Sequence, residues 1–296
     1  MKREEKCRLL VIIPNYNMGK ETLNNRKKML ENMGIGATDI TVEDICGGPD
    51  SIESEYDEVM AGKYILDRIR TASKNEFDAI IIYCANDPVI NAAREISEIP
   101  VIGPGYTSIM IAQDLAANYS FVTVLDKMIP LVRRKISAFG FDHARCASIR
   151  SIGVEVTELD RNKDALYEHV LEVCRKCKDE DGAHAIVLGC LGMAGFGKRI
   201  SEALKIPVLD PAEVCIKYAE LICVAGLMYS AKATDKSILS KERRKTKKVD
   251  YTGMTKAGEA TVRMAIYAAQ MYYHLTYQMV QDYGEEAATK TIKKAM

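Results

Sequence analysis

The chain has 296 residues, of which 41 are Lys or Arg and 41 are Asp or Glu, so its formal net charge at pH 7 is zero. This balance argues against a protein that binds nucleic acid or a membrane surface. Of all residues 48% are apolar, which excludes disorder as the main state and allows one large core or two modest ones.

The beginning of the sequence does not resemble a targeting segment. Residues 1–8 are charged, and the apolar run 9–13 is too short for the core of a signal peptide or for a membrane span. We therefore expect a cytoplasmic protein with no membrane partner. The nine cysteines are spread through a chain too large to need disulfide bonds, so we expect reduced thiols.

Short apolar runs alternate with longer segments of helical period, and this pattern predicts parallel sheets covered by helices. It occurs twice along the chain. In the first half, the expected strands and the helices between them lie at 8–13, 19–33, 40–44, 52–72, 79–83, 88–96 and 101–103. In the second half, the expected strands lie at 121–125, 147–152, 185–188 and 208–209, again with helices between them.

The two halves share a local pattern at matching places. Residues 78–104 and 184–211 each contain an apolar strand, a cysteine at its carboxyl end, a turn of small residues, a helix, and Ile-Pro-Val at the start of the next strand. We interpret this similarity as an internal duplication of one α/β unit. It divides the chain into a first α/β domain at 1–104 with a return helix at about 212–232, and a second at 105–211.

The composition changes after Ser230. Residues 241–248 hold six basic side chains and one Glu, a run that predicts an exposed linker. Residues 256–282 then show the period of one long helix, with an apolar stripe that includes Val262, Ile266, Tyr273 and Tyr277. Because this helix is apolar on more than one side, we expect the extension at 233–296 to serve assembly into a homo-oligomer.

Cys84 and Cys190 are the sharpest chemical feature of the sequence, because each stands at the carboxyl end of an expected strand. Ligands of open α/β sheets collect there, where helix amino termini offer free amide donors. A helix amino terminus also lowers the pKa of a nearby thiol. If the halves face each other, two such thiols can remove a proton from one face of a carbon and deliver one to the other, which racemisation requires. A lone cysteine at such a place is more often a small core residue.

The neighbouring loops offer polar groups for a ligand. Several glycines surround Cys190, and glycine allows close approach of the backbone to a ligand. Asp87, three residues after Cys84, either caps the following helix or orients or tunes the thiol. Asn15 follows the first strand and either binds a carboxylate or imide or makes the turn. Thr123 offers a hydroxyl near the same edge.

Other candidate sites are weaker. Cys174 and Cys177 form a single CxxC, too few ligands for a structural zinc, and we expect surface thiols there. The four histidines are scattered without metal-ligand spacing. No phosphate-binding loop of the GxxxxGK[ST] type occurs, so a nucleotide is not expected. We therefore predict no cofactor and no metal.

Several motifs together resemble the aspartate/glutamate/hydantoin racemase superfamily, and the hydantoin racemase-like branch is the most similar. They are IIPNYN at 12–17, GGPDSIESEYDE at 47–58, CANDP at 84–88, FVTVL at 121–125 and VLGCLGMA at 187–194. The similarity covers roughly residues 8–232 and leaves the carboxyl-terminal segment without a counterpart.

The resemblance implies two Rossmann-like parallel-sheet domains related by a pseudo-twofold axis, here with a carboxyl-terminal helical extension. It also implies a cofactor-independent racemase or epimerase in which Cys84 and Cys190 act as acid and base on opposite faces of Cα. The substrate would be an amino acid or a hydantoin-like cyclic amide. The residues implied in substrate binding are Asn15, Tyr16, Asn86, Thr123, Gly192 and Met193.

This sequence departs from the family pattern at the substrate site. Tyr16 stands where a small Thr is usual, and Val124 where a second Thr is common. Two alternatives to racemisation follow from the same positions: a maleate-type cis-trans isomerase in which one cysteine adds to the alkene, and a non-catalytic protein that binds a small molecule. A pure binder needs neither cysteine, so the paired thiols argue against the last.

Overall fold

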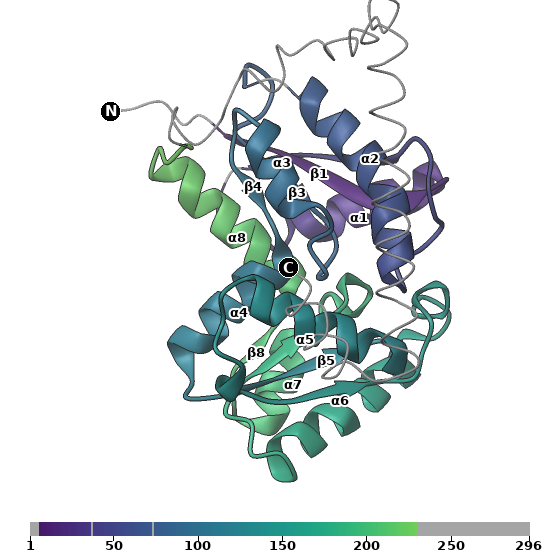
Figure 1. The fold of residues 1–296 in the computed structure, drawn as a ribbon, viewed down its shortest axis with the longest axis vertical. Coiled ribbons are helices and arrows are strands. Elements are labelled where there is room, and N and C mark those ends of the chain that lie inside the picture. Colours follow the sequence, from purple (N-terminus) through teal and green to yellow (C-terminus); the bar gives the residue numbers. More distant parts are fainter. Residues whose placement is uncertain (1–5, 37, 73, 230–296) are drawn as a thin grey trace, which may run out of the picture. The chain divides into compact units, whose positions relative to one another are not determined.

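The computed structural model describes residues 6–36, 38–72 and 74–229. They form two parallel four-stranded sheets (Figure 1). The first sheet has the order β2-β1-β3-β4 and the second β6-β5-β7-β8. The two sheets therefore have the same strand order, with β1, β2, β3 and β4 corresponding to β5, β6, β7 and β8. The predicted α/β class with two parallel sheets is confirmed.

In the first half, the elements in chain order are β1 (Cys7–Tyr16), α1 (Lys20–Glu31), β2 (Thr38–Ile45), α2 (Glu55–Thr71), β3 (Ala79–Ile82), α3 (Ile90–Ile96) and β4 (Val101–Ile102). In the second half they are α4 (Pro104–Leu115), β5 (Tyr119–Thr123), α5 (Ile129–Ala138), β6 (Cys146–Ser151), α6 (Lys163–Asp179), β7 (Ile186–Leu188), α7 (Gly197–Leu204), β8 (Val208–Leu209) and α8 (Pro211–Val224). Four short 3-10 turns are η1 (Asp126–Met128), η2 (His143–Arg145), η3 (Val156–Glu158) and η4 (Leu191–Met193). All eight predicted strands are present, with ends that differ from prediction by three residues or fewer.

The central strands are apolar on both faces because helices cover both sides of each sheet. Along β1, Leu9 and Val11 pack toward α1 and α8, whereas Leu10 and Ile12 pack toward α2. In the second sheet, Val122 packs with residues of α6 and α7, and Phe121 with residues of α4 and α5. This alternation with period 2 places each strand between two helical layers and fixes the direction in which its loops emerge.

The chain crosses between the two sheets twice. Helix α4 follows β4 but buries Ile109 and Ala112 with residues of the second sheet. Helix α8 follows β8 but buries Cys215, Ile216 and Ala219 with residues of the first sheet. The two linking helices also contact each other. Residues of α8 thus return to the first sheet, at the place where a return helix is predicted.

Two predictions about cysteines are wrong. Cys7 at the start of β1 and Cys223 near the end of α8 form a disulfide, with their Cα atoms 6.1 Å apart, a separation usual for such a bond. Cys174 and Cys177 are fully buried on the inner face of α6 and are not surface thiols. Their spacing places both on the same apolar stripe as Val170 and Val173, so helix phase explains their burial.

The predicted basic linker and the predicted helix at 256–282 lie outside the described residues, and the homo-oligomer stays a prediction. No helix within 6–36, 38–72 and 74–229 is long and apolar enough to cross a membrane.

Candidate active site

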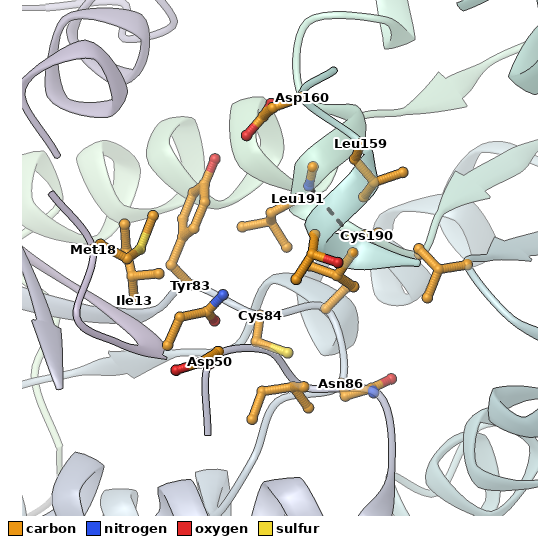
Figure 2. Close-up of a pocket in the computed structure, with 18 of the residues that line it drawn as sticks. Ile13, Met18, Asp50, Tyr83, Cys84, Asn86, Leu159, Asp160, Cys190 and Leu191 are labelled. Carbon is orange, nitrogen blue, oxygen red and sulfur yellow. Dashed lines mark hydrogen bonds between the residues drawn. The ribbon is translucent and has the colours of Figure 1, made fainter. Parts of the chain in front are cut away.

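A cavity of about 400 Å³ lies where loops from the carboxyl ends of both sheets come together. Its lining includes residues at or just beyond the carboxyl ends of the two central strands of each sheet: Asn15 and Tyr16 at the end of β1, Cys84 and Asn86 after β3, Thr123 and Val124 at the end of β5, and Gly189 and Cys190 after β7. Figure 2 shows Cys84 and Cys190 on separate loops at this cavity. A volume of this size suits a small organic ligand.

Cys84 is the second residue after β3, and its backbone is fixed on both sides. The Tyr83 amide donates to the carbonyl of Ile12 at 2.8 Å, which prolongs the pairing with β1. The Cys84 carbonyl in turn accepts from the Asp87 amide at 3.0 Å. The thiol is half-buried at the cavity. Burial raises the pKa of Cys84 far above its ordinary value, and the backbone N–H of Asn86 opposes this effect.

Cys190 occupies the corresponding position after β7. The Gly189 amide donates to the carbonyl of Val122 at 2.7 Å, just as Tyr83 donates to Ile12 in the first sheet. The Cys190 sulfur accepts from the Gly192 amide at 3.4 Å (Figure 2). Burial raises the pKa of Cys190 to about 11, while the Gly192 amide and the cationic side chains of Arg26 and Lys163 oppose the rise. In each loop the amide two residues after the cysteine therefore acts on the sulfur.

The predicted lowering of both thiol pKa values is wrong, because burial outweighs the helix effect at both positions. Helix α3 begins at Ile90 and α7 at Gly197, six and seven residues after the respective cysteines. The field of a helix amino terminus falls off within about one turn, so neither thiol profits from it. Each sulfur has instead one backbone amide, and Cys190 has in addition the cations of Arg26 and Lys163.

The predicted binding residues fall into two groups. Asn15, Tyr16, Asn86, Thr123 and Gly192 line the cavity, with Tyr16 45% exposed. Met193 does not line it: its side chain is buried in the second core, and its amide donates to the Cys190 carbonyl at 3.0 Å. The position of Met193 therefore does not match a direct role in substrate binding.

Asp87 does not cap the helix that follows it, but in addition to burial its charge raises the pKa of the Cys84 thiol. Asp87 is 1% exposed, and its carboxylate accepts from the amides of Gly105 at 3.0 Å and Tyr106 at 2.5 Å. It therefore caps α4, which begins 17 residues later in the chain, and not the helix that follows it. Burial raises the pKa of Asp87 to about 7, against the effect of these two amides.

The cavity also contains charged residues that the sequence analysis did not find: Arg26 from α1, Asp50 from the loop after β2, and Asp160 from the loop before α6. Residues 156–160, which we call the cover segment, contribute four lining positions in all, Asp160 included. The Val156 amide of this segment donates to Glu53 at 2.7 Å, so a first-half side chain holds it. Asp50 lies in the GGPDSIESEYDE motif at 47–58, but the sequence analysis assigned it no role, and only the folded chain brings these residues together.

Among the residues that the structure describes, no group of three or more His, Cys, Asp or Glu side chains is arranged to hold a metal ion.

Comparison with known proteins agrees with this geometry. A family model described as Asp/Glu/Hydantoin racemase matches residues 9–219. The chain belongs to the Asp/Glu/hydantoin racemase family. It is 34% identical to a hydantoin racemase of Pseudomonas sp. (strain NS671) over 195 residues, 66% of this chain and 78% of that protein. It is 30% identical to a hydantoin racemase of Paenarthrobacter aurescens over 225 residues, 75% of this chain and 94% of that protein.

Among solved structures, the allantoin racemase from Klebsiella pneumoniae matches with a TM-score of 0.70 and 31% identity, over 76% of this chain and 91% of that one. Both the sequence relatives and this structure are racemases. The protein is accordingly a racemase, an isomerase of this family.

Proposed function

We propose that the protein racemises a hydantoin-like cyclic ureide, a class that includes allantoin, by using Cys84 and Cys190 as base and acid. The observation that carries the proposal is that two thiols, each following the third strand of its own sheet, line one cavity. The relatives named above act on hydantoins and allantoin, which supports a ring substrate.

The proposed reaction exchanges one C–H bond for another at the ring carbon that carries the substituent. One cysteine thiolate takes the proton from this carbon, and the electron pair of the broken C–H bond moves into the adjacent carbonyl to give an enolate. The other thiol donates its proton to the opposite face of the carbon, and the enolate electrons form the new C–H bond. The product is the mirror image, and the two sulfurs have exchanged one proton.

The remaining polar lining suits the ring. Hydantoins present carbonyl acceptors and ring N–H donors, and the side chains of Asn15, Asn86 and Thr123 offer both kinds of partner at the cavity. A donor close to the enolate oxygen stabilises the charge that develops in the transition state. Tyr16 at the cavity edge lies where a substituent of the ring would pass.

The mechanism needs no group beyond the two thiols, because the acidic C–H beside a ring carbonyl is activated by the substrate itself. We expect activity to survive exhaustive dialysis against EDTA and to need no added pyridoxal phosphate. Restoration of dialysed enzyme only by a metal ion or a cofactor would contradict this part of the proposal.

The deciding experiment is racemisation in D2O. Single enantiomers of 5-substituted hydantoins, of allantoin, and of free aspartate and glutamate are incubated with the enzyme, and optical rotation and deuterium content are followed together. We expect loss of rotation and incorporation of one deuterium at the stereogenic carbon of a cyclic ureide. Racemisation of the free amino acids alone would overturn the substrate class, and loss of rotation without deuterium would overturn the mechanism.

A further inference from the structure

The two cysteines lie in unlike electrostatic surroundings. Two cationic side chains bind the loop of Cys190: Arg26 donates to the Leu191 carbonyl at 3.5 Å, and Lys163 donates to the Gly192 carbonyl at 2.9 Å. Both carbonyls lie within two residues of the sulfur. Asp160 opposes these cations, but it is itself paired with Lys163 at 2.6 Å. Among the described residues, no carboxylate forms an ion pair with Arg26, so its charge remains at the cavity.

Cys84 faces negative groups instead. Glu58 of α2 acts on this thiol, and so does Asp87 of its own loop. Glu58 is 6% exposed and pairs with Lys135 at 2.7 Å, but its second carboxylate oxygen is buried without a hydrogen-bond partner among the described residues. Lys135 thus neutralises only part of the effect of Glu58. Negative charge close to a thiol disfavours its ionisation, and positive charge favours it.

Arg26 is placed to distinguish the two loops. It comes from α1 of the first half but reaches the loop of Cys190 in the second half. On the way its guanidinium lies over the ring of Tyr83, with 5.6 Å between its central carbon and the ring centroid. Stacking of this kind holds a guanidinium in place and limits its conformations. The charge is thereby fixed at the cavity, beside the backbone that carries Cys190.

We propose that Arg26 is a positioning residue that makes the two thiols unequal, so that Cys190 ionises before Cys84. The proposal rests on the two-thiol mechanism above and adds a direction to it. When the two thiols of the resting enzyme share one proton, that proton lies on Cys84. The first proton then moves from substrate carbon to Cys190, and the second from Cys84 to the opposite face. The order of the two pKa values in the structure agrees with this direction.

Alkylation of each thiol as a function of pH tests the proposal. The full-length protein is treated with iodoacetamide, a neutral probe, between pH 6 and 11, and the peptides that contain Cys84 and Cys190 are quantified separately by mass spectrometry. We expect the labelling midpoint of Cys190 to lie below that of Cys84. An earlier midpoint for Cys84, or a common one, would overturn the proposal.

The variants Arg26→Met and Arg26→Lys test whether Arg26 causes the difference in ionisation between the two thiols. Methionine keeps an apolar stem over Tyr83 without the charge, and lysine keeps the charge without the planar group. We expect Arg26→Met to slow labelling of Cys190 about tenfold at a fixed pH below the midpoint, which corresponds to about one pKa unit. Arg26→Lys should recover part of the loss. The labelling rate of Cys84 should change less than that of Cys190, which separates a change in the ionisation of one thiol from a general change in access to the cavity.

A matched control is Arg134→Met, because Arg134 pairs with Glu55 at 2.6 Å on the surface and does not line the cavity. It should leave both midpoints in place. An unchanged Cys190 midpoint in Arg26→Met, even with a raised KM, would overturn the proposal and assign Arg26 to substrate binding. Labelling needs no turnover, so an enzyme that racemises no hydantoin but keeps the order of the midpoints contradicts only the proposed function.

Discussion

The loops after Cys84 and Cys190 start from equivalent strands, but their backbones turn by different means. The first loop contains no glycine, and Asp87 and Val89 both adopt left-handed conformations, with φ of 49° and 50°. The second loop places a glycine, Gly195, at its left-handed position, with φ of 92°. Left-handed backbone costs a non-glycine residue about 1–2 kcal/mol, more for a β-branched one, so the first loop must be held by its surroundings.

A buried carboxylate holds the cysteine loop in each half, but it belongs to a residue at a different position of the repeat. In the first half Asp87 of the cysteine loop caps the amide of Gly105 in α4. In the second half Asp210, directly before α8, caps the amide of Ala212 at 3.0 Å and also binds the Gly195 amide of the cysteine loop at 2.6 Å. Gly105 and Ala212 are equivalent positions of the repeat, each directly after a helix-starting proline.

The acid has thus moved between the halves, from the cysteine loop in the first to the residue before the linking helix in the second. Gly103 stands where the second half has Asp210, and a Cβ atom added to Gly103 would lie 2.6 Å from the carboxyl carbon of Asp87. In both halves one carboxylate joins the cysteine loop to the first turn of the linking helix. Both copies of the duplicated unit keep this contact, but its carboxylate belongs to the cysteine loop in the first half and to the residue before the linking helix in the second.

The largest expected effect tests whether the two loops are equivalent in chemistry. Cys84→Ser and Cys190→Ser should each lower the rate of racemisation by about 10²-fold or more, because a serine hydroxyl ionises far less readily than a thiol and each turnover needs both an acid and a base. Initial rates from polarimetry give the loss. Each variant should retain slow deuterium exchange of one enantiomer, through the thiol that remains.

The control for these variants is Cys46→Ser, which changes an exposed thiol outside the cavity lining and should keep full activity. Near wild-type turnover in one of the two cavity variants, with the fold verified by circular dichroism, would show that only one loop takes part in proton transfer.

The position of the acid in the second half can be reproduced in the first. Asp87→Gly removes the cap of α4, and Gly103→Asp alone forces a second carboxylate against Asp87, so each should lower the free energy of unfolding by about 2–3 kcal/mol. The double variant places the acid directly before the linking helix, as in the second half, and should be more stable than either single one. Urea denaturation measures the cycle, and a favourable coupling of about 1–3 kcal/mol is expected.

Asp142→Gly is the comparison variant, because Asp142 is an exposed cap that binds the Ala144 amide at 2.8 Å. Its loss should cost about 1 kcal/mol or less. If the two single losses in the first half simply add, the carboxylate is not interchangeable between the two positions, and the correspondence of the halves does not extend to this contact.

The sequence predicts the framework well because strands buried on both faces are continuous apolar runs. Residues 79–82, for example, are all apolar and all buried. The two cysteine loops follow from the same logic, since parallel topology brings the carboxyl ends of strands to one edge. Local patterns therefore predict correctly the positions at which the strands end.

Contacts between distant segments escape local patterns. Helix α4, which Asp87 caps, begins 17 residues later in the chain and beyond strand β4. Arg26 reaches the loop of Cys190 from α1, which is far from that loop in the sequence. The predicted lowering of the two thiol pKa values is wrong for a related reason. Burial of a thiol depends on the whole cavity, whereas a helix terminus is a local feature of the sequence. The error at Cys174 and Cys177 is different: the apolar stripe through Val170 and Val173 already contained the signal.

The pH dependence of the free energy of unfolding should distinguish the buried carboxylate of Asp87 from exposed carboxylates. An unfolded Asp titrates near 3.9, whereas burial raises the pKa of Asp87 to about 7 in the folded state. Between these values the folded protein binds more protons than the unfolded one, so the contribution of Asp87 to the free energy of unfolding falls as the pH rises from about 4 to about 7.

Asp87→Asn, which resembles the protonated carboxyl, should lack this decrease. Urea midpoints of wild type and variant are compared across that pH range, with Asp142→Asn as the exposed control. Parallel curves for wild type and Asp87→Asn would mean that the two capping amides keep the carboxylate ionised. Asp210→Asn extends the measurement to the second half, where burial also raises the pKa of the carboxyl.

The smallest expected effect concerns the cover segment at 156–160, which differs from the rest of the cavity lining in how it is held. Glu53 of the first half is largely buried, accepts from the Val156 amide and lies 3.5 Å from Lys127. Leu159 of the segment packs against Gly192, beside Cys190. Loss of the Glu53 carboxylate should therefore loosen the cover over the second cysteine and leave the first unchanged.

Glu53→Ala should raise KM about three- to tenfold with little change in kcat. This change corresponds to about 0.6–1.4 kcal/mol, which is less than the about 1.5–3 kcal/mol of a hydrogen bond to a charged group because water replaces part of the lost bond. Iodoacetamide should label Cys190 faster at high pH, and Cys84 at an unchanged rate. Glu55→Ala is the matched control, since Glu55 pairs with Arg134 on the surface and such pairs contribute about 0–1 kcal/mol. Equal acceleration at both thiols would mean that Glu53 holds the two halves together as a whole and that the cover segment does not belong to one cysteine.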